Sequence, residues 1–406
     1  MSTSKLSESQ TQLEPDFSQV EGGAPWMFGS MPGFVSLNPT PQNNIYIGLF
    51  AFFFAPIALF VLEYSVINVL QTASLGQPLS SSIGQIGLFG AAVMLVLLGS
   101  TSVFSSVGLV VTAAWASLFS LAYWFFAIIY SSKNTSGSLL LTQLNLSVIE
   151  KFLLLGNSTQ WCHLPTIVAI ISVCAAFASA RVRQLRRFEV MSAAKLPLKQ
   201  RQKVAVMVNS GDALWWSTPG QKMPATRYRA HLSAFLCALG LGLIACATCY
   251  YLAPSNVDST VYSSSLMELY SVDFLNLIIF IASLAGLMVL TVRSTVGTTF
   301  VSWGLFALMG LIGIPLWASL SGNVATASSM VNTSIAFTSP ILGMFGILIG
   351  AFSIGVHLVR TGPLSFSEII ALIETSQNKD NDKESIMENQ AKENQASAEP
   401  EAKPDR

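Results

Sequence analysis

The sequence from Ser294 to Gly304, STVGTTFVSWG, places five hydroxyl residues and two glycines in an apolar part of the chain. A shorter phrase of the same kind, STSVFSSVG, runs from Ser100 to Gly108. Each phrase separates two long apolar runs that follow one another almost without a break. Hydroxyl side chains can satisfy backbone groups where a helix is interrupted at membrane depth, and glycine lets helices approach closely. Two interpretations are therefore open: a tight turn between membrane helices, or part of a transport pathway.

The composition excludes a soluble protein. Of the 406 residues, 52% are hydrophobic and only 10% are charged, whereas about a quarter of a soluble domain is charged. A helix needs about twenty apolar residues to cross a bilayer. Eight apolar runs predict an all-α polytopic transmembrane helical bundle with eight spans, at about 45–66, 84–101, 104–130, 165–182, 231–252, 273–292, 298–320 and 336–359.

The basic residues predict the orientation. The stretch 181–229 holds a large share of the 21 Lys and Arg residues, whereas the stretches 67–83, 254–271 and 321–335 hold none. Loops rich in Lys and Arg stay in the cytoplasm. With eight spans, both termini then face the cytoplasm, and we expect a multi-pass protein of the cell (plasma) membrane. Residues 1–44 form a polar cytoplasmic leader, and 361–406 form a cytoplasmic tail that should be mostly disordered.

The two halves of the chain share short sequences. Phe104, Ser106 and Gly108 match Phe300, Ser302 and Gly304 at a constant offset of 196. An Ala-Phe pair also recurs, at 176–177 and 351–352. These matches predict two four-helix membrane repeats, 45–182 and 231–360, joined by a basic cytoplasmic linker, 183–230. Because each repeat has an even number of spans, the two copies share one orientation.

Three phrases resemble motifs of the acetate uptake transporter family, which includes the acetate/succinate–proton symporter and the yeast ammonia/acetate transport group. NPTP, from Asn38 to Pro41, is similar to the phrase that precedes the family's first span. GSTSVFSSVG (99–108) and RSTVGTTFVSWG (293–304) resemble the phrase at its second-to-third span junction. Val107 and Trp303 stand where the family has a tyrosine, and each half has four predicted spans where the family has six.

The resemblance implies a pathway within a single unit for acetate or another small carboxylate, moved together with protons. It also implies a homo-oligomer. Side chains at position 107 or 303 would set the width of the pore, although ordinary aromatic packing is the favoured interpretation of Trp303. The pathway residues that we predict on this basis are Asn38, Phe104, Ser106, Val107, Phe300, Ser302 and Trp303.

Two ionisable residues are candidates for proton or charge coupling. Glu63 ends the first predicted span, and a carboxylate removed from water holds its proton near neutral pH. Glu63 is therefore a candidate proton carrier, with solvation at the membrane interface as the alternative. Arg293 lies within the second phrase, where it could attract a carboxylate substrate or act as an anchor on the cytoplasmic side.

The sequence lacks the HExxH, GxSxG, P-loop and Rossmann glycine motifs, so we expect no enzyme activity, no catalytic residues and no cofactor. No metal site is expected, because each of the three histidines flanks a span without a second ligand. The lipid bilayer is the expected partner, and a nucleic acid is not. Two functions remain: a secondary transporter or channel for a small carboxylate, coupled to protons, and a non-transporting membrane scaffold or envelope-assembly subunit. A transporter should gather buried polar residues around a lumen, whereas a scaffold should be packed shut by glycines such as Gly343, Gly346 and Gly350.

Overall fold

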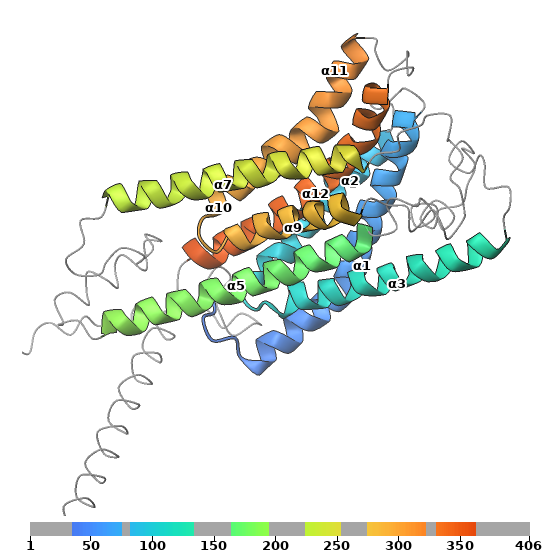
Figure 1. Cartoon of the computed structure of the whole chain (residues 1–406). Helices are drawn as coiled ribbons and strands as arrows, with labels where there is room; N and C mark the ends of the chain where they lie inside the picture. The colour runs from blue at the N-terminus through green and yellow to red at the C-terminus, as the bar shows by residue number, and fades with distance from the viewer. Residues whose placement is uncertain are drawn as a thin grey trace, which may run out of the picture.

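A computed structural model describes residues 35–74, 82–133, 164–194, 224–252, 274–321 and 330–362, and these form a bundle of helices (Figure 1). The first four long helices are α1 (Pro41–Ser74), α2 (Ser82–Ser100), α3 (Val107–Lys133) and α5 (Leu164–Ala194), with a short 3₁₀ turn, η2 (Thr101–Val103), after α2. The later helices are α7 (Pro224–Tyr251), α9 (Phe274–Leu290) and α12 (Met330–Thr361). Between α9 and α12 lies a composite helix made of α10 (Thr295–Thr299), the π-helix η4 (Phe300–Gly313) and α11 (Ile314–Ser321). All eight apolar runs are thus helical, as the sequence predicts.

Six helical segments are long and apolar enough to cross a membrane, so the chain is a multi-pass membrane protein. They are Pro41–Val69, Ser82–Val103, Leu164–Arg187, His231–Tyr250, Thr295–Leu316 and Thr338–Thr361. The other two predicted spans correspond to Val107–Tyr123, which is part of the 27-residue helix α3, and to Phe274–Leu290.

Two helices extend into the predicted basic linker. The helix α5 continues to Ala194, and α7 begins at Pro224. The helical groups therefore extend beyond the predicted residues 182 and 231, and the linker between them is shorter than predicted. Arginine is a good helix former, and the arginine-rich sequence after 180 therefore prolongs α5 beyond its apolar part. The leader before residue 35, the stretch 195–223 and the tail after residue 362 lie outside the described residues.

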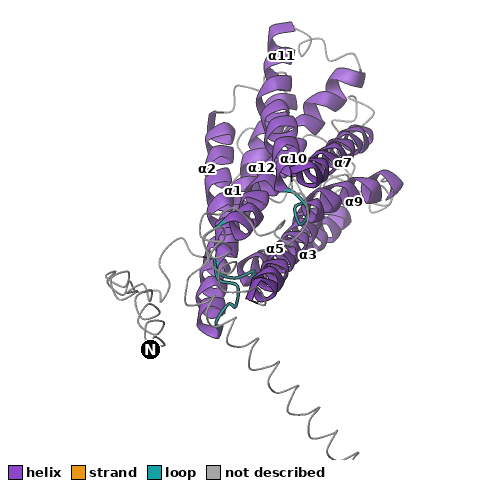
Figure 2. Ribbon diagram, turned by 90° about the vertical axis from the view of Figure 1, so that its left-hand side faces the viewer, coloured by secondary structure: helices purple, strands orange, loops and turns teal. Residues whose placement is uncertain are grey.

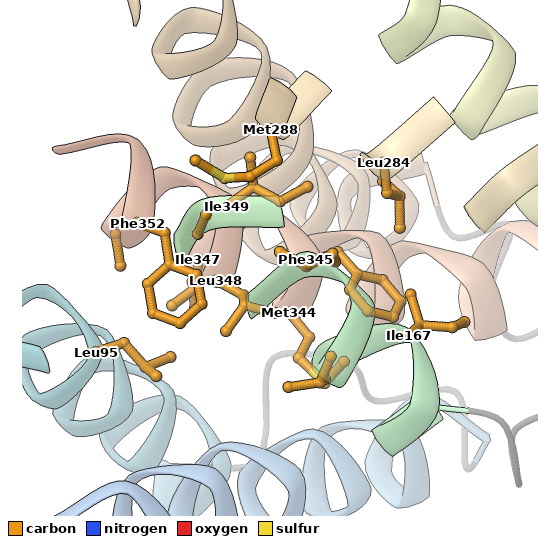
Figure 3. Packing of buried hydrophobic residues seen from close by; sticks show 14 of the residues in the cluster. Leu95, Ile167, Leu284, Met288, Met344, Phe345, Ile347, Leu348, Ile349 and Phe352 are labelled. Carbon is orange, nitrogen blue, oxygen red and sulfur yellow. The ribbon is translucent and has the colours of Figure 1, made fainter. Parts of the chain in front are cut away.

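The helix α12 lies at the centre of the bundle. In its spanning segment 83% of the residues are buried, against 28% for α1. Figure 3 shows Phe345, Leu348 and Phe352 of α12 among apolar side chains of α2, α5 and α9. Since α12 is enclosed by other helices, only its neighbours present a broad apolar face to lipid.

The first and second groups of helices are interleaved. Within the first group, α1 packs against α2 and α3, and α3 packs against α5; within the second, α7 packs against α9 and α10, and η4 against α12. Across the groups, α2 packs against α12, α9 packs against α5, and α5 packs against α12 (Figure 2). A Cβ added at Gly99 of α2 would lie 2.7 Å from the carbonyl oxygen of Ala351 of α12. In both directions, therefore, the second helix of one group packs against the fourth helix of the other: α2 against α12, and α9 against α5.

Candidate functional site

The NPTP phrase forms the start of α1. Asn38 is exposed and lies in the segment before the helix. The Thr40 hydroxyl oxygen accepts a hydrogen bond from the Asn43 N–H at 3.2 Å, and Pro41 is the first helical residue. This combination of a threonine cap and a following proline is a common way to begin a helix. The local role of the phrase is thus accounted for by helix initiation.

The first hydroxyl-rich phrase forms the turn between α2 and α3. The Ser105 hydroxyl oxygen accepts a hydrogen bond from the Val107 N–H at 3.1 Å and thereby caps α3. The same hydroxyl donates to the Asn44 Oδ1 of α1 at 2.5 Å. Three residues after the cap, Gly108 faces α1, where an added Cβ would lie 3.1 Å from the Ile47 Cγ2.

The second phrase repeats this arrangement with other partners. The Ser294 hydroxyl oxygen accepts from the Val296 N–H at 3.4 Å and caps α10. It also lies 2.8 Å from the Nδ1 of His231 of α7. Three residues after this cap, Gly297 faces α7, where an added Cβ would lie 2.8 Å from the Phe235 Cα. The sequences SSVG (105–108) and STVG (294–297) therefore occupy equivalent turns.

This equivalence corrects the register proposed from the sequence. The offset of 196 pairs Phe104, which lies in the turn before the Ser105 cap, with Phe300, which begins η4 beyond α10. The structural match pairs the two capping serines instead, at an offset of 189, and pairs Asn44 with His231 at an offset of 187. When the two capping serines are matched, the recurring Phe-x-Ser-x-Gly letters fall about two helical turns apart in the two segments.

The predicted pathway residues fall into two groups that belong to different turns. In the first, Phe104, Ser106 and Val107 are half-buried around the start of α3, and Val107 faces α1, where a Cβ added at Gly48 would lie 3.4 Å from its Cγ1. In the second, Phe300 is 54% exposed, and Ser302 is buried and donates to the Thr298 carbonyl oxygen at 2.6 Å. The polar group of Ser302 is thus bound within its own helix.

Trp303 packs against α12. A Cβ added at Gly350 would lie 2.5 Å from the Trp303 Nε1, and this ring nitrogen is buried with no hydrogen-bond partner among the described residues. The glycine provides the space that the indole occupies. This contact favours the interpretation of Trp303 as a packing aromatic over that of a pore-lining side chain.

Glu63 is the candidate whose surroundings differ most from those of an interfacial residue. It is 1% exposed, and its Oε2 accepts a hydrogen bond of 2.7 Å from the hydroxyl of Tyr123, a fully buried residue of α3. Its Oε1 is buried and has no hydrogen-bond partner among the described residues. Solvation at the interface is therefore the wrong interpretation, because α1 continues to Ser74 and α3 covers the carboxyl group.

A polar stripe on α3 leads from the capped turn to Glu63. We give this name to Thr112, Ser120 and Tyr123, which share the buried face of the helix because their spacing follows the helical repeat. Ser120 lies 2.6 Å, between hydroxyl oxygens, from Thr166 of α5. The stripe therefore connects α3 to both α1 and α5 through side-chain hydrogen bonds.

The corresponding surface of η4 is mostly apolar and closely packed. Its buried residues are Val301, Ser302, Phe306, Ala307 and Gly310. A Cβ added at Gly346 of α12 would lie 2.5 Å from the Ala307 nitrogen, and one added at Gly310 would lie 2.6 Å from the Ser339 carbonyl oxygen. The glycines expected to serve packing do so here, and they bring the backbones of η4 and α12 together.

The candidate Arg293 and a second arginine near the same turn, Arg360, differ in environment. Arg293 is exposed in the turn between α9 and α10. Arg360 of α12, which the sequence analysis did not single out, is 7% exposed and donates to the carbonyl oxygens of Thr291 and Val292 at the end of α9. The buried guanidinium of Arg360 therefore stabilises the end of α9.

Sequence reasoning also missed Tyr123, Asn44 and the histidine contacts, because each depends on a partner some sixty residues away along the chain. It overlooked that Cys246 and Cys249 stand in a Cys-Ala-Thr-Cys sequence; both are free thiols in α7. Among the described residues no group of three His, Cys, Asp or Glu side chains could hold a metal ion.

Comparison with protein-family models, with curated proteins and with solved structures finds no match for this chain. The fold itself defines the class: an all-helical, multi-pass membrane protein with a buried carboxyl–phenol pair between two of its helices.

Proposed function

We propose that this protein is a secondary transporter of the cell membrane that moves a small carboxylate, such as acetate, together with a proton through its first four helices. In this proposal Glu63 carries the proton and Tyr123 positions its carboxyl group. The observation that carries the proposal is the burial of Glu63 with one oxygen bonded to Tyr123. An ionisable residue inside a membrane span is costly, and such residues commonly mark proton or ion pathways.

The difference between the two groups of helices supports this assignment. The matching turns at Ser105 and Ser294 favour an internal duplication in which α1, α2, α3 and α5 correspond to α7, α9, the composite helix and α12. At the offset of 187 that relates α1 to α7, Glu63 corresponds to Tyr250. The polar stripe of α3 has its counterpart in the largely apolar buried face of η4. The first four helices then conduct, and the last four form the structural copy.

The charges at the two ends suit an anionic substrate. Basic side chains gather at the ends of α5 and α12, where Arg183, Arg186 and Arg360 are buried, and we place this end in the cytoplasm. A carboxylate that arrives with a proton crosses the apolar interior in neutral form and is attracted by the arginines as an anion once the proton is released. The sequence resemblance to acetate uptake transporters points to the same class of substrate.

The test is uptake into proteoliposomes. Purified full-length protein should take up labelled acetate under an inward proton gradient, and an uncoupler should abolish this uptake. Glu63→Gln should remove the proton-driven uptake, because an amide side chain does not bind and release a proton near neutral pH. Tyr123→Phe should reduce this uptake. The control variant Tyr250→Phe changes the corresponding position of the second group and should leave uptake intact. Uptake by Glu63→Gln equal to that of the unchanged protein would refute the role of the carboxyl group.

A second candidate function is a non-transporting scaffold, which the glycine packing of η4 against α12 favours. A scaffold needs a rigid bundle and a binding surface, and the basic stretch 195–223 between α5 and α7 could provide the surface. Absence of acetate and succinate uptake above that of empty liposomes, with monodisperse protein of intact helical content, would favour this function. The partner would then be sought by cross-linking through that stretch.

A further inference from the structure

Two histidines meet at the start of the composite helix, at the end of the bundle opposite Glu63. His231 of α7 lies 2.8 Å from the Ser294 hydroxyl through its Nδ1. His357 of α12 lies 2.9 Å from the Thr295 hydroxyl through its Nδ1. Ser294 and Thr295 are both buried, whereas His231 is half-buried and His357 is exposed. Three helices that are far apart in the sequence are thus held together by two hydroxyl–imidazole contacts.

The equivalent turn in the first group of helices makes the same contact without a titratable side chain. There the capping hydroxyl of Ser105 donates to the Asn44 Oδ1 of α1 at 2.5 Å. Both capping serines follow the same pattern, in which the hydroxyl oxygen accepts the N–H of the residue two positions later. The two copies therefore differ in that an amide stands on one side and an imidazole on the other.

We propose that His231, His357, Ser294 and Thr295 form a proton-binding site that links the cytoplasmic pH to the contact of α7 and α12 with α10. The ligand of this site is the proton itself. The site stands on its own geometry and does not depend on carboxylate transport or on Glu63.

The chemistry of the contact supports this inference. The Ser294 hydroxyl oxygen already accepts the Val296 N–H, so its proton is available for donation to a neutral imidazole Nδ1. A protonated imidazole has no acceptor nitrogen left, and the hydroxyl must then turn its proton elsewhere. Histidine is the side chain whose ordinary titration falls in the physiological range. The protonated Nδ1–H can still donate to the Ser294 oxygen, but it then shares this acceptor with the Val296 N–H. Protonation therefore reverses the direction of the imidazole–hydroxyl hydrogen bond and makes the imidazole compete for the oxygen that caps α10.

The surrounding charges act in the same direction. Of the elements packed against α10, α7 carries Arg227 and Arg229 shortly before His231 in the sequence, and the turn after α9 carries Arg293. The helix α12 carries Arg360, and η4 carries no charged residue. Arg360 follows His357 by three residues in α12, so the two side chains lie on neighbouring positions of one helix face. The helix α5, which packs against α12, adds Arg181, Arg183, Arg186 and Arg187 at this end. A new positive charge on His231 thus meets other positive charges and the positive end of the composite helix. His357 meets positive charges too, but it lies in the last turn of α12, whose partial negative charge offsets part of the repulsion.

Hydrogen–deuterium exchange on the full chain in lipid nanodiscs tests the inference, with exchange times scaled for the intrinsic effect of pH. Between pH 7.5 and 5.5 we expect the amides of 295–299 to lose about fivefold protection, the size expected for one lost helix cap. The amides of 107–111, behind the Asn44–Ser105 contact, should not change. His231→Asn with His357→Asn should abolish the response, and Asn44→His should confer it on 107–111.

Two results would overturn the inference: no pH response at 295–299 in the unchanged protein, or a full response that persists in the double variant. If the double variant does not fold, His357→Asn alone decides the question, because it should weaken the response. A response of unchanged size in that single variant would contradict the proposed site.

Discussion

Replacement of Tyr123 by phenylalanine removes one hydroxyl group and leaves the packing of its ring in place. Tyr123 is fully buried, and its hydroxyl is bonded to the Glu63 Oε2 at 2.7 Å. In the variant the carboxyl group of Glu63 is left with no described hydrogen-bond partner, since its Oε1 has none in the unchanged protein. Hydrogen bonds between membrane helices average about 0.6 kcal/mol, but an orphaned buried polar group costs about 1–3 kcal/mol. Because Tyr123→Phe orphans the buried carboxyl group, we expect the unfolding free energy to fall by about 2 kcal/mol.

The assay is reversible unfolding by dodecyl sulfate in mixed micelles, read by circular dichroism, on a double-mutant cycle. The variants are Tyr123→Phe, Glu63→Leu and the two together. When both partners become apolar no group is orphaned, so the double variant should be more stable than Tyr123→Phe alone. The coupling energy should then be about 1–2 kcal/mol. Additivity of the two single effects within about 0.5 kcal/mol would refute the reasoning, because it would mean that the two side chains do not interact.

Three further predictions concern packing, capping and the pathway. Gly346→Ala should lower the unfolding free energy by about 1–3 kcal/mol, because its Cβ would lie 2.5 Å from the Ala307 nitrogen. Gly240→Ala, where a Cβ meets nothing within 4 Å, should be neutral or stabilising by up to about 1 kcal/mol; equal effects in the same unfolding assay would contradict the packing. Ser105→Ala should destabilise the start of α3 by about 1 kcal/mol, seen as faster amide exchange at 107–111, and unchanged exchange would exclude the cap. Val107→Trp should reduce acetate uptake by filling the space beside α1, and normal uptake in a folded variant would remove position 107 from the pathway.

Hydropathy was sufficient to predict the helices, because an apolar run of about twenty residues has few other stable states in a bilayer. The ends of the helices were harder to predict. The arginine-rich extension of α5 to Ala194 carries no apolar signal.

The side-chain partners could not be predicted from one sequence. Glu63 and Tyr123 lie 60 residues apart, and their contact depends on how α1 and α3 are rotated about their axes. The equivalence of the two turns, by contrast, was present in the sequence as SSVG and STVG. It was missed because the Phe-x-Ser-x-Gly letters gave a longer apparent match, and these letters do not report which serine caps the helix.

The interleaving of the two groups of helices affects biosynthesis. The partner of α2 across the bundle is α12, the last of the described helices to leave the ribosome, and the partner of α5 is α9. The first four helices therefore enter the membrane with α2 and α5 still exposed to lipid on the faces that later become internal. The close contact between Gly99 at the end of α2 and the backbone of Ala351 cannot form until α12 has been synthesised. The contact of α5 with α9 can form before α12 is made, whereas the contact of α2 with α12 can form only after the last described helix has been synthesised.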